Sequence, residues 1–272
     1  MCTLAHMTIK TLFTTSVSFL SVLALTAASP VWAQKSTVSN PAKQSKTISG
    51  YPTYTGKVKY NPAKNGFNGW HNYGKQGVNP QWVVEGDAFH LTAKGGGDLV
   101  TDAVFGDFEL TLEWKISEAG NSGIFYLVNE DTAKYKAIYM TAPEYQVLDN
   151  DKHPDGKYEN HRAGANYDLI VPEPGHTKPV GEWNKTRIVL KDSVVEHWLN
   201  DHKVVSYKLW TEEWRAMVAK SKFKNWAGYG MSPVGRIGLQ DHADKVWYRN
   251  IVIKGLDKKK AKALRRAMKA RK

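Results

Sequence analysis

The chain has 272 residues, a net charge of +12 and a single cysteine, and these properties already exclude several classes of protein. Residues 254–272 contain ten Lys or Arg and one acid, so this tail carries +9 and, with Lys10 also set aside, the rest of the chain only +2. The core therefore lacks the charge of a nucleic-acid-binding domain, and one cysteine permits no disulfide framework. The tail is typical of a solvated basic segment, with contact to an anionic surface as the alternative.

The first 33 residues have the pattern of a secretory signal peptide. Lys10 precedes an uncharged apolar stretch over residues 12–28, and Val31-Trp32-Ala33 supplies a small-residue cleavage site before Gln34. The apolar stretch is short and interrupted by Thr and Ser, which disfavours a membrane anchor, so no membrane span is predicted. Cleavage would remove Cys2 and deliver the mature chain to the periplasm or the cell exterior.

The remaining chain divides into a linker, one domain and a tail. Residues 34–58 are rich in Ser, Thr, Lys and Gln, and we predict a disordered linker there. Aromatic and apolar residues become dense at about Tyr60, so residues 59–257 are predicted to form a single domain, followed by a basic tail over residues 258–272.

Hydrophobic residues in this domain recur with a period of two, which predicts β-strands. In residues 107–116, Phe, Leu, Leu, Trp and Ile alternate with Glu, Thr, Glu and Lys, as expected for a half-buried antiparallel strand. Further strands are predicted over residues 82–84, 88–92, 124–128, 145–148, 186–190, 194–199, 203–207, 236–240 and 246–253. One helix is predicted over residues 212–219, opened by Thr211. The pattern indicates an all-β, two-sheet antiparallel sandwich with one short helix.

Three polar clusters lie at the ends of these strands: Asn121-Ser122-Gly123, residues 143–150 (Pro-Glu-Tyr-Gln-Val-Leu-Asp-Asn) and Gln240-Asp241-His242. Strand alternation places Glu144 and Gln146 on one face, and Gln240 and His242 on one face. Asp149 falls on the opposite face from Glu144 unless the strand ends or bulges near Leu148. Each cluster alone is equally compatible with ordinary turns and caps, whereas together they are typical of a polar groove on a curved sheet.

Tryptophans and carboxylates offer further candidates for ligand contacts. Trp70 and Trp183 lie beside Gly and Asn, so we expect them in loops, where a Trp can stack on a sugar ring. Glu109 and Glu113 share a strand face but are separated by about 13 Å, too far for the paired carboxyls of a conventional glycosidase. Such a pair would have to form across strands, for instance between Glu113 and Glu144.

Metal-ligand spacing is absent from the sequence. It contains no His-x-x-x-His and no cysteine pair, and Asp149-Asn150-Asp151 is only a weak calcium signal. The sequence therefore predicts no cofactor and no metal-binding residue, while leaving a divalent metal open.

Several short motifs, in a fixed order over residues 65–256, resemble the 3-keto-disaccharide hydrolase domain family. They are Asn121-Ser-Gly-Ile-Phe125, Glu144-Tyr-Gln-Val-Leu-Asp-Asn150, Ala163-Gly-Ala-Asn-Tyr167, Gly181-Glu-Trp-Asn184, His197-Trp-Leu-Asn200, Gly238-Leu-Gln-Asp-His242 and Tyr248-Arg-Asn-Ile251. The resemblance implies a concanavalin/laminarinase-like jelly roll, export, and an exported enzyme that cleaves 3-keto-glycosides by base-assisted elimination followed by addition of water.

The resemblance also assigns roles to individual residues. It implies that Glu144 or His242 is the catalytic base, and that the substrate-binding residues are Asn121, Ser122, Gln146, Asp149 and Gln240, to which the loop residue Trp183 is added. Two positions depart from the family pattern: Asp201 stands where the hairpin usually has Gly, and the residues after Gly123 lack the Arg that many members carry. The second departure means that a role the family assigns to this Arg cannot be carried over to this chain.

Two other functions are compatible with the same sequence. A jelly roll with exposed tryptophans can be a non-catalytic carbohydrate-binding module, and cross-strand carboxylates would make a conventional two-carboxylate glycosidase. All three readings have a carbohydrate as the partner.

Overall fold

The computed structural model describes residues 44–45 and 53–256, so the predicted signal peptide, the basic tail and most of the predicted linker lie outside the described residues. Its elements in chain order are β1 (Gln44–Ser45), β2 (Thr53–Tyr54), β3 (Lys57–Lys59), α1 (Pro62–Asn65), β4 (Trp70–Asn72), β5 (Trp82–Glu85), β6 (Ala88–Leu91), β7 (Leu99–Thr101), β8 (Phe108–Ile116), β9 (Asn121–Val128), η1 (Ile138–Met140), β10 (Glu144–Leu148), η2 (Pro154–Lys157), η3 (Glu159–His161), β11 (Asn184–Lys191), β12 (Val194–Leu199), β13 (His202–Lys208), α2 (Glu212–Lys220), η4 (Lys222–Asn225), β14 (Arg236–Leu239) and β15 (Val246–Gly255).

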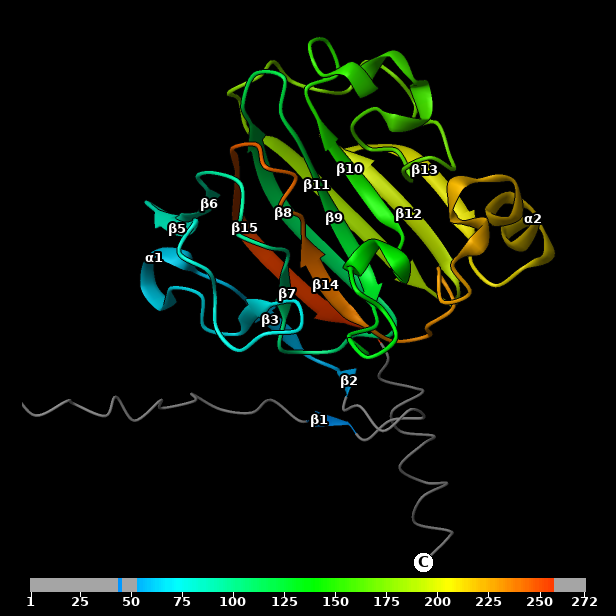
Figure 1. Ribbon diagram of the computed structural model, residues 1–272, viewed down its shortest axis with the longest axis horizontal. Helices are drawn as coiled ribbons and strands as arrows, with labels where there is room; N and C mark the ends of the chain where they lie inside the picture. The colour runs from blue at the N-terminus through cyan, green and yellow to red at the C-terminus, as the bar shows by residue number, and fades with distance from the viewer. Residues whose placement is uncertain (1–43, 46–52, 257–272) are drawn as a thin grey trace, which may run out of the picture. The chain divides into compact units, whose positions relative to one another are not determined.

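Two antiparallel sheets pack face to face, as Figure 1 shows. The first has five strands in the order β10-β9-β14-β7-β4, and the second has eight, in the order β13-β12-β11-β8-β15-β6-β5 with β3 also paired to β15. Residues of both sheets contribute to one hydrophobic core between them. The prediction of an all-β jelly-roll sandwich is confirmed. Besides the one predicted helix, α2, the described residues form α1 and four short 3-10 helices.

Strand β8 shows how the alternating pattern produces this core. Its Phe108, Leu110, Leu112, Trp114 and Ile116 are all buried, whereas the residues between them are partly exposed on the outer face of the eight-stranded sheet. Burying one face of a strand and leaving the other in water fixes its register, because a one-residue slip would exchange the two faces. The strand therefore forms as its sequence predicts.

The domain begins earlier than the sequence indicates. Strand β3 crosses the predicted boundary between linker and domain at residues 58 and 59, and it pairs with β15 through Val252↔Lys59 and Lys254↔Lys57. Before it, the backbone N–H of Tyr54 donates to the carbonyl of Val104 at 2.7 Å. Alternation is not readable in three residues rich in lysine, so only the pairing with β15 identifies this strand.

Trp70 also differs from its predicted place. It was expected in a loop, but it lies in β4 with 4% of its surface exposed. Its ring packs edge-on against Tyr60 and Phe89, with centroids 5.2 and 5.7 Å away. Trp70 is therefore part of the core rather than of a sugar-binding surface.

A buried histidine fastens the loop after β10 to the second sheet. His197 of β12 is fully buried; its Nε2 lies 2.9 Å from the hydroxyl of Tyr126, and its Nδ1 lies 3.0 Å from the carbonyl of Gly164. Burial lowers the pKa of His197 to about 4, so the ring is neutral at physiological pH. Gly164 N–H in turn donates to the carbonyl of Gln146, so this contact holds the edge of β10 in place.

Within the described residues, no helix has the length and apolar character needed to cross a bilayer.

Candidate active site

The candidate site lies on the outward face of the five-stranded sheet, where β10, β9 and β14 lie side by side (Figure 1). Gln146 of β10 is directly opposite Gly123 of β9. On the other side of β9, the backbone N–H of Gln240, just beyond the end of β14, donates to the carbonyl of Gly123 at 2.9 Å. Two glutamines therefore flank a glycine across neighbouring strands, although they are 94 positions apart in the chain.

A hollow of about 280 Å³ opens over this row. Its lining consists of Asn121, Tyr139, Glu144, Gln146, Tyr167, Lys222, Phe223, Trp226, Gln240 and His242. The floor comes from strands and the walls come from η1, the loop after η3, and η4. Five of the eight residues predicted from sequence line this one hollow: Asn121, Glu144, Gln146, Gln240 and His242.

Glu144 is the most unusual group of the floor. Only 6% of its surface is exposed, and burial raises the pKa of its carboxyl to about 8, with further increases from Asp98 and Asp155 and a decrease from Lys222. A carboxyl poised near neutral pH is suited to proton transfer, because it can both accept and release a proton under working conditions.

Gly123 makes room for that carboxyl. A Cβ placed on Gly123 would lie 2.1 Å from Oε1 of Glu144 and 2.8 Å from its Cδ, far inside van der Waals contact. The backbone of Gly123 does not have a positive φ, so conformation does not require glycine here. The missing side chain is needed because the Glu144 carboxyl occupies its place.

Gln146 has unsatisfied hydrogen-bonding capacity. It is 1% exposed, and both Nε2 and Oε1 of its side chain are buried without a hydrogen-bond partner among the described residues; Oε1 of Gln240 is in the same condition. Leaving a buried amide unpaired costs about 1–3 kcal/mol. Two such amides lining one hollow indicate that a polar ligand supplies the missing partners.

At the rim of the hollow, two carboxylates accept hydrogen bonds from backbone N–H groups. The N–H of Asn121 donates to Oδ2 of Asp244 at 3.0 Å, and Asp241 accepts from the N–H groups of Gly95 and Gly97 at 3.0 and 2.8 Å. These contacts fix the segment that carries His242, whose side chain is 49% exposed. His242 therefore stands at the mouth of the hollow, in reach of solvent.

The other three predicted residues lie elsewhere. Ser122 points into the core, where its hydroxyl is 2.8 Å from the hydroxyl of Tyr248 and donates to the carbonyl of Gln240. Asp149 accepts from the backbone N–H groups of Ala119, Asp151 and Lys152, so it organises the turn after β10. Strand alternation explains Ser122, which is one position from Asn121 and so faces the other side of β9. Asp149 follows the last residue of β10, so its place is set by the turn and not by alternation.

Trp183 packs on the outer face of the other sheet. The guanidinium of Arg249 lies 4.0 Å from its ring centroid, and the ammonium of Lys115 lies 5.2 Å away. This Trp is a platform for cations of β15 and β8 and does not line the hollow.

The walls contain groups that the sequence did not single out: Tyr139, Tyr167, Lys222, Phe223 and Trp226. Tyr139 and Trp226 have ring centroids 5.2 Å apart, so an aromatic wall faces the polar floor. An aromatic wall opposite hydrogen-bonding groups is well suited to a sugar ring, which has apolar C–H faces and polar edges. No local sequence pattern marks these five residues as ligand contacts, because an aromatic residue in a loop can equally pack into the core.

The cross-strand carboxylate pair is not formed. Glu113 lies on the outer face of the eight-stranded sheet, where Oε2 accepts from Nε of Arg249 at 2.7 Å, whereas Glu144 belongs to the five-stranded sheet. Among the described residues, Glu144 is the one carboxyl group in the lining of the hollow. The arrangement lacks the two facing carboxyls that conventional glycosidases require.

One group of potential metal ligands lies beside the hollow. Ligand atoms of His153, His242 and Asp244 are within 4.8 Å of one another, in the part of the chain that the structure describes. However, Nδ1 of His153 accepts a hydrogen bond from the N–H of Asp155 at 3.1 Å, which places the proton of the neutral ring on Nε2. His153 could bind a metal only by giving up this bond, so no step is assigned to a metal here.

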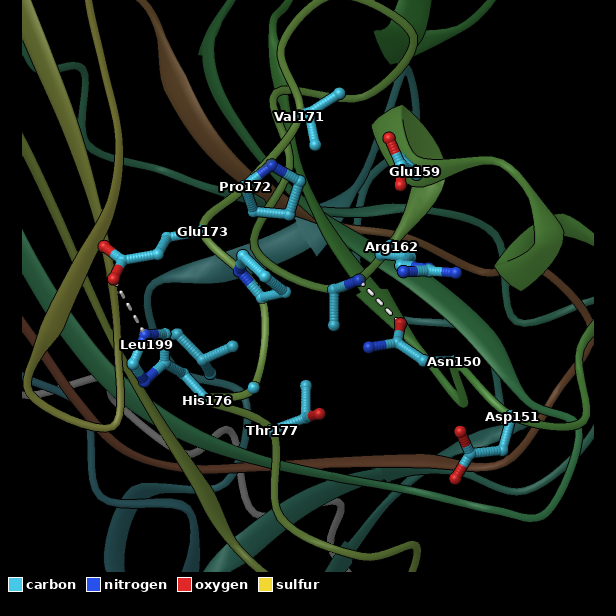
Figure 2. A pocket seen from close by; sticks show the side chains of 13 residues that line it. Asn150, Asp151, Glu159, Arg162, Val171, Pro172, Glu173, His176, Thr177 and Leu199 are labelled. Atoms are coloured by element: carbon cyan, nitrogen blue, oxygen red, sulfur yellow. Dashed lines mark hydrogen bonds and ion pairs between the residues drawn. The ribbon is translucent and has the colours of Figure 1, made fainter.

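A larger hollow, of about 470 Å³, lies among the loops that follow β10 (Figure 2). Several of its polar groups already have partners. Oδ1 of Asn150 accepts from the N–H of Ala163 at 2.8 Å, and Oε1 of Glu173 lies 3.5 Å from Nε2 of His176. Its lining contains none of the eight site residues predicted from sequence. The smaller hollow is therefore the better candidate for chemistry.

Comparison with known proteins identifies the family to which the chain is similar. The family model of the 3-keto-alpha-glucoside-1,2-lyase-like domain matches residues 61–254. A Bacteroides thetaiotaomicron protein named 3-keto-disaccharide hydrolase is 44% identical over 220 residues, covering 70% of this chain and 76% of that protein. A crystal structure described as a candidate glycosyl hydrolase, from Parabacteroides distasonis, is 34% identical with a TM-score of 0.67, covering 74% of this chain and 94% of that one. A second structure from that organism, 22% identical with a TM-score of 0.56, covers 73% of this chain and 100% of that one and has the same fold.

Proposed function

Because the chain belongs to the 3-keto-alpha-glucoside-1,2-lyase-like domain family and is a glycoside hydrolase, we propose that it cleaves 3-keto-glycosides by elimination followed by addition of water. A ketone at C3 makes the C2 hydrogen acidic and places the glycosidic oxygen on C1 in the β position. One base is then sufficient to start cleavage, which suits a hollow to which the described residues contribute a single carboxyl.

The proposed reaction has two stages, an elimination and an addition of water. The Glu144 carboxylate takes the C2 proton, and the electron pair of the C2–H bond forms an enolate whose negative charge rests on O3. The pair then returns to form the C1–C2 double bond while the C1–O bond breaks, and the leaving oxygen takes a proton from His242 at the mouth of the hollow. The oxygen of a water molecule then bonds to C1 and one of its protons goes to His242. Glu144, whose carboxyl proton exchanges with solvent, gives a proton to C2, which yields the free 3-keto sugar.

The observation that carries this proposal is the pairing of one buried carboxyl with unpartnered amides. Glu144 has a raised pKa and Gln146 has two orphaned polar atoms, and both line the same sugar-sized hollow. The amides of Gln146 and Gln240 hold the hydroxyl groups of the sugar, so that C2 faces the carboxylate. Positioning of this kind supplies much of the rate in a proton abstraction.

Deuterium incorporation tests the mechanism directly. Incubation of the protein with a 3-keto-disaccharide in D2O is expected to give a 3-keto sugar with deuterium at C2, because the C2 hydrogen leaves and a solvent proton returns. Mass spectrometry and proton NMR of the product, taken at early times, measure the label.

A control without enzyme corrects for spontaneous exchange of the product. Direct displacement at C1 would give a product without deuterium at C2 and would contradict elimination. Equal cleavage of the unoxidised disaccharide would also contradict it, since that sugar has no acidic C2 hydrogen.

We further propose that the protein acts outside the cytoplasm. The support is the N-terminal pattern of Lys10, an apolar stretch and Val31-Trp32-Ala33. Expression of the full chain in a Gram-negative host is expected to yield an extracytoplasmic product that begins at Gln34, as read by N-terminal sequencing. An intact N-terminus on protein recovered only from the cytoplasm would contradict export.

A further inference from the structure

The backbone of Lys222, in the wall of the hollow, is fixed by its own hydrogen bond and by contacts of the next residue, Phe223. Its N–H donates to Oδ2 of Asp168 at 3.2 Å. The next residue, Phe223, is buried and stacks on Tyr229 with ring centroids 4.0 Å apart, and Oγ of Ser221 accepts from the N–H of Phe223 at 3.1 Å. The base of the Lys222 side chain is therefore fixed even though the residue as a whole is exposed.

The charge of Lys222 is not neutralised by a carboxylate. Its ammonium lies over the ring of Tyr167, 3.8 Å from the centroid, and among the described residues no carboxylate lies within 4.0 Å of it. Other lysines do pair: Lys152 with Glu118 at 2.6 Å and Lys185 with Asp201 at 2.7 Å. An aromatic ring attracts an ammonium without cancelling its charge, so the full positive charge of Lys222 faces the hollow.

This charge acts on the group that starts the reaction. The positive field of Lys222 lowers the pKa of Glu144, against the increase that burial produces. A cation that stabilises a carboxylate on the floor of the hollow also stabilises negative charge on a sugar oxygen bound there, and more strongly once the sugar has displaced water.

We propose that Lys222 is a catalytic residue that donates a hydrogen bond to O3 of the sugar and stabilises the enolate formed when Glu144 removes the C2 proton. In this step the C2–H bond breaks, its electron pair forms the C2–C3 double bond, and the carbonyl pair moves to O3 beside the ammonium. The proton stays on Glu144, and Lys222 keeps its own proton throughout. The role rests on the proposed elimination.

The test compares Lys222→Met with Lys224→Met and Lys222→Arg. Lys224 lies on the same short helix and is exposed but does not line the hollow, so its replacement removes one charge from the same region. We expect Lys222→Met to lower kcat/KM for a 3-keto-disaccharide about 10²- to 10³-fold, the usual effect of losing one oxyanion donor, and Lys224→Met to leave it unchanged. Lys222→Arg retains the charge and is expected to recover part of the loss.

The pH profile separates this role from a structural one. Activity should rise with pH as Glu144 ionises. The groups around Glu144 on other elements are Lys222, Asp98, Asp155, Tyr126, Tyr167, Tyr229 and Tyr248, which interact with it electrostatically, and Tyr139 and His242, which line the same hollow. Removing only the cation raises the pKa of Glu144. In Lys222→Met the rise of activity with pH should therefore occur at higher pH, whereas in Lys222→Arg it should occur close to the wild-type pH. Unchanged turnover in Lys222→Met, or a loss without this shift to higher pH, overturns the proposal.

Failure of the mechanism and failure of this role give different results. Wild-type protein that introduces no deuterium at C2 contradicts the elimination itself. Wild-type protein that introduces deuterium, together with Lys222→Met protein that does so at the same rate, contradicts only the role of the lysine.

Discussion

Replacing Glu144 with glutamine is expected to lower turnover of a 3-keto-glycoside by about 10²- to 10⁴-fold, the range over which a positioned general base acts. Glutamine preserves the size of the side chain and its place over Gly123, so the hollow keeps its shape. We therefore expect binding of the sugar to persist. Steady-state kinetics and calorimetric titration with the product sugar measure the two effects separately.

The same substitution should stabilise the free protein. Folding raises the pKa of Glu144 from 4.5 to about 8, so the folded state is fully favoured below pH 4.5 and loses stability as the pH rises towards 8. Glutamine does not titrate, and the variant should gain about 1–3 kcal/mol of unfolding free energy at pH 8 but little at pH 4.5. Urea unfolding at both values tests this difference.

Glu113→Gln is the matched control for Glu144→Gln. Glu113 is the carboxylate of the eight-stranded sheet that binds Arg249, far from the lining of the hollow. Its replacement should leave turnover unchanged. Loss of turnover in both variants would favour a two-carboxylate glycosidase, and full activity of Glu144→Gln would exclude Glu144 as the base.

Gly123→Ala is expected to lower kcat by about 10²-fold or more while the protein still folds. The added methyl would meet Oε1 of Glu144 at 2.1 Å, and the far end of that side chain must move away. A misplacement of about 1 Å can cost 10²-fold in rate, because the base no longer lies in line with the C2 hydrogen. Circular dichroism and thermal unfolding establish that the fold persists, and single-turnover kinetics measure the chemical step.

Gly238→Ala provides the control one strand away. On Gly238, in β14, a Cβ would meet Phe125 and Ile138 at 3.3 Å, which small shifts of neighbouring side chains relieve. This variant should retain most of its turnover. If Gly238→Ala and Gly123→Ala lose activity equally, the effect is a general disturbance of the sheet and the specific account of Gly123 fails.

Strand faces could be predicted from the sequence, because alternation along one strand is a local property. It correctly placed Glu144 and Gln146 together and left open the place of Asp149, which proved to organise a turn. The helix beginning after Thr211 was also predicted, and the hydroxyl of Thr211 does accept from the N–H of Trp214. Each of these outcomes depends on residues a few positions apart.

The walls of the hollow could not be predicted in the same way. Lys222 and Trp226 line the same hollow as Glu144, although they are about 80 positions further along the chain. They do so because η4, which follows α2, lies against this part of the sheet. Trp70 and Trp183 occupy similar sequence surroundings, yet one is in the core and the other lies under Arg249. Long-range pairing of strands decides these positions, and no local pattern records it.

The division of the hollow into a strand-built floor and loop-built walls has a consequence for divergence among relatives. The proton abstraction that we propose uses Glu144, with Gln146 and Gly123 beside it, and these residues lie in paired strands where little change is tolerated. Tyr139 lies in η1 and Trp226 directly follows η4, so neither belongs to a strand of the sheet. If the proposed chemistry holds, relatives are expected to differ more at these two wall positions than at Glu144, Gln146 and Gly123.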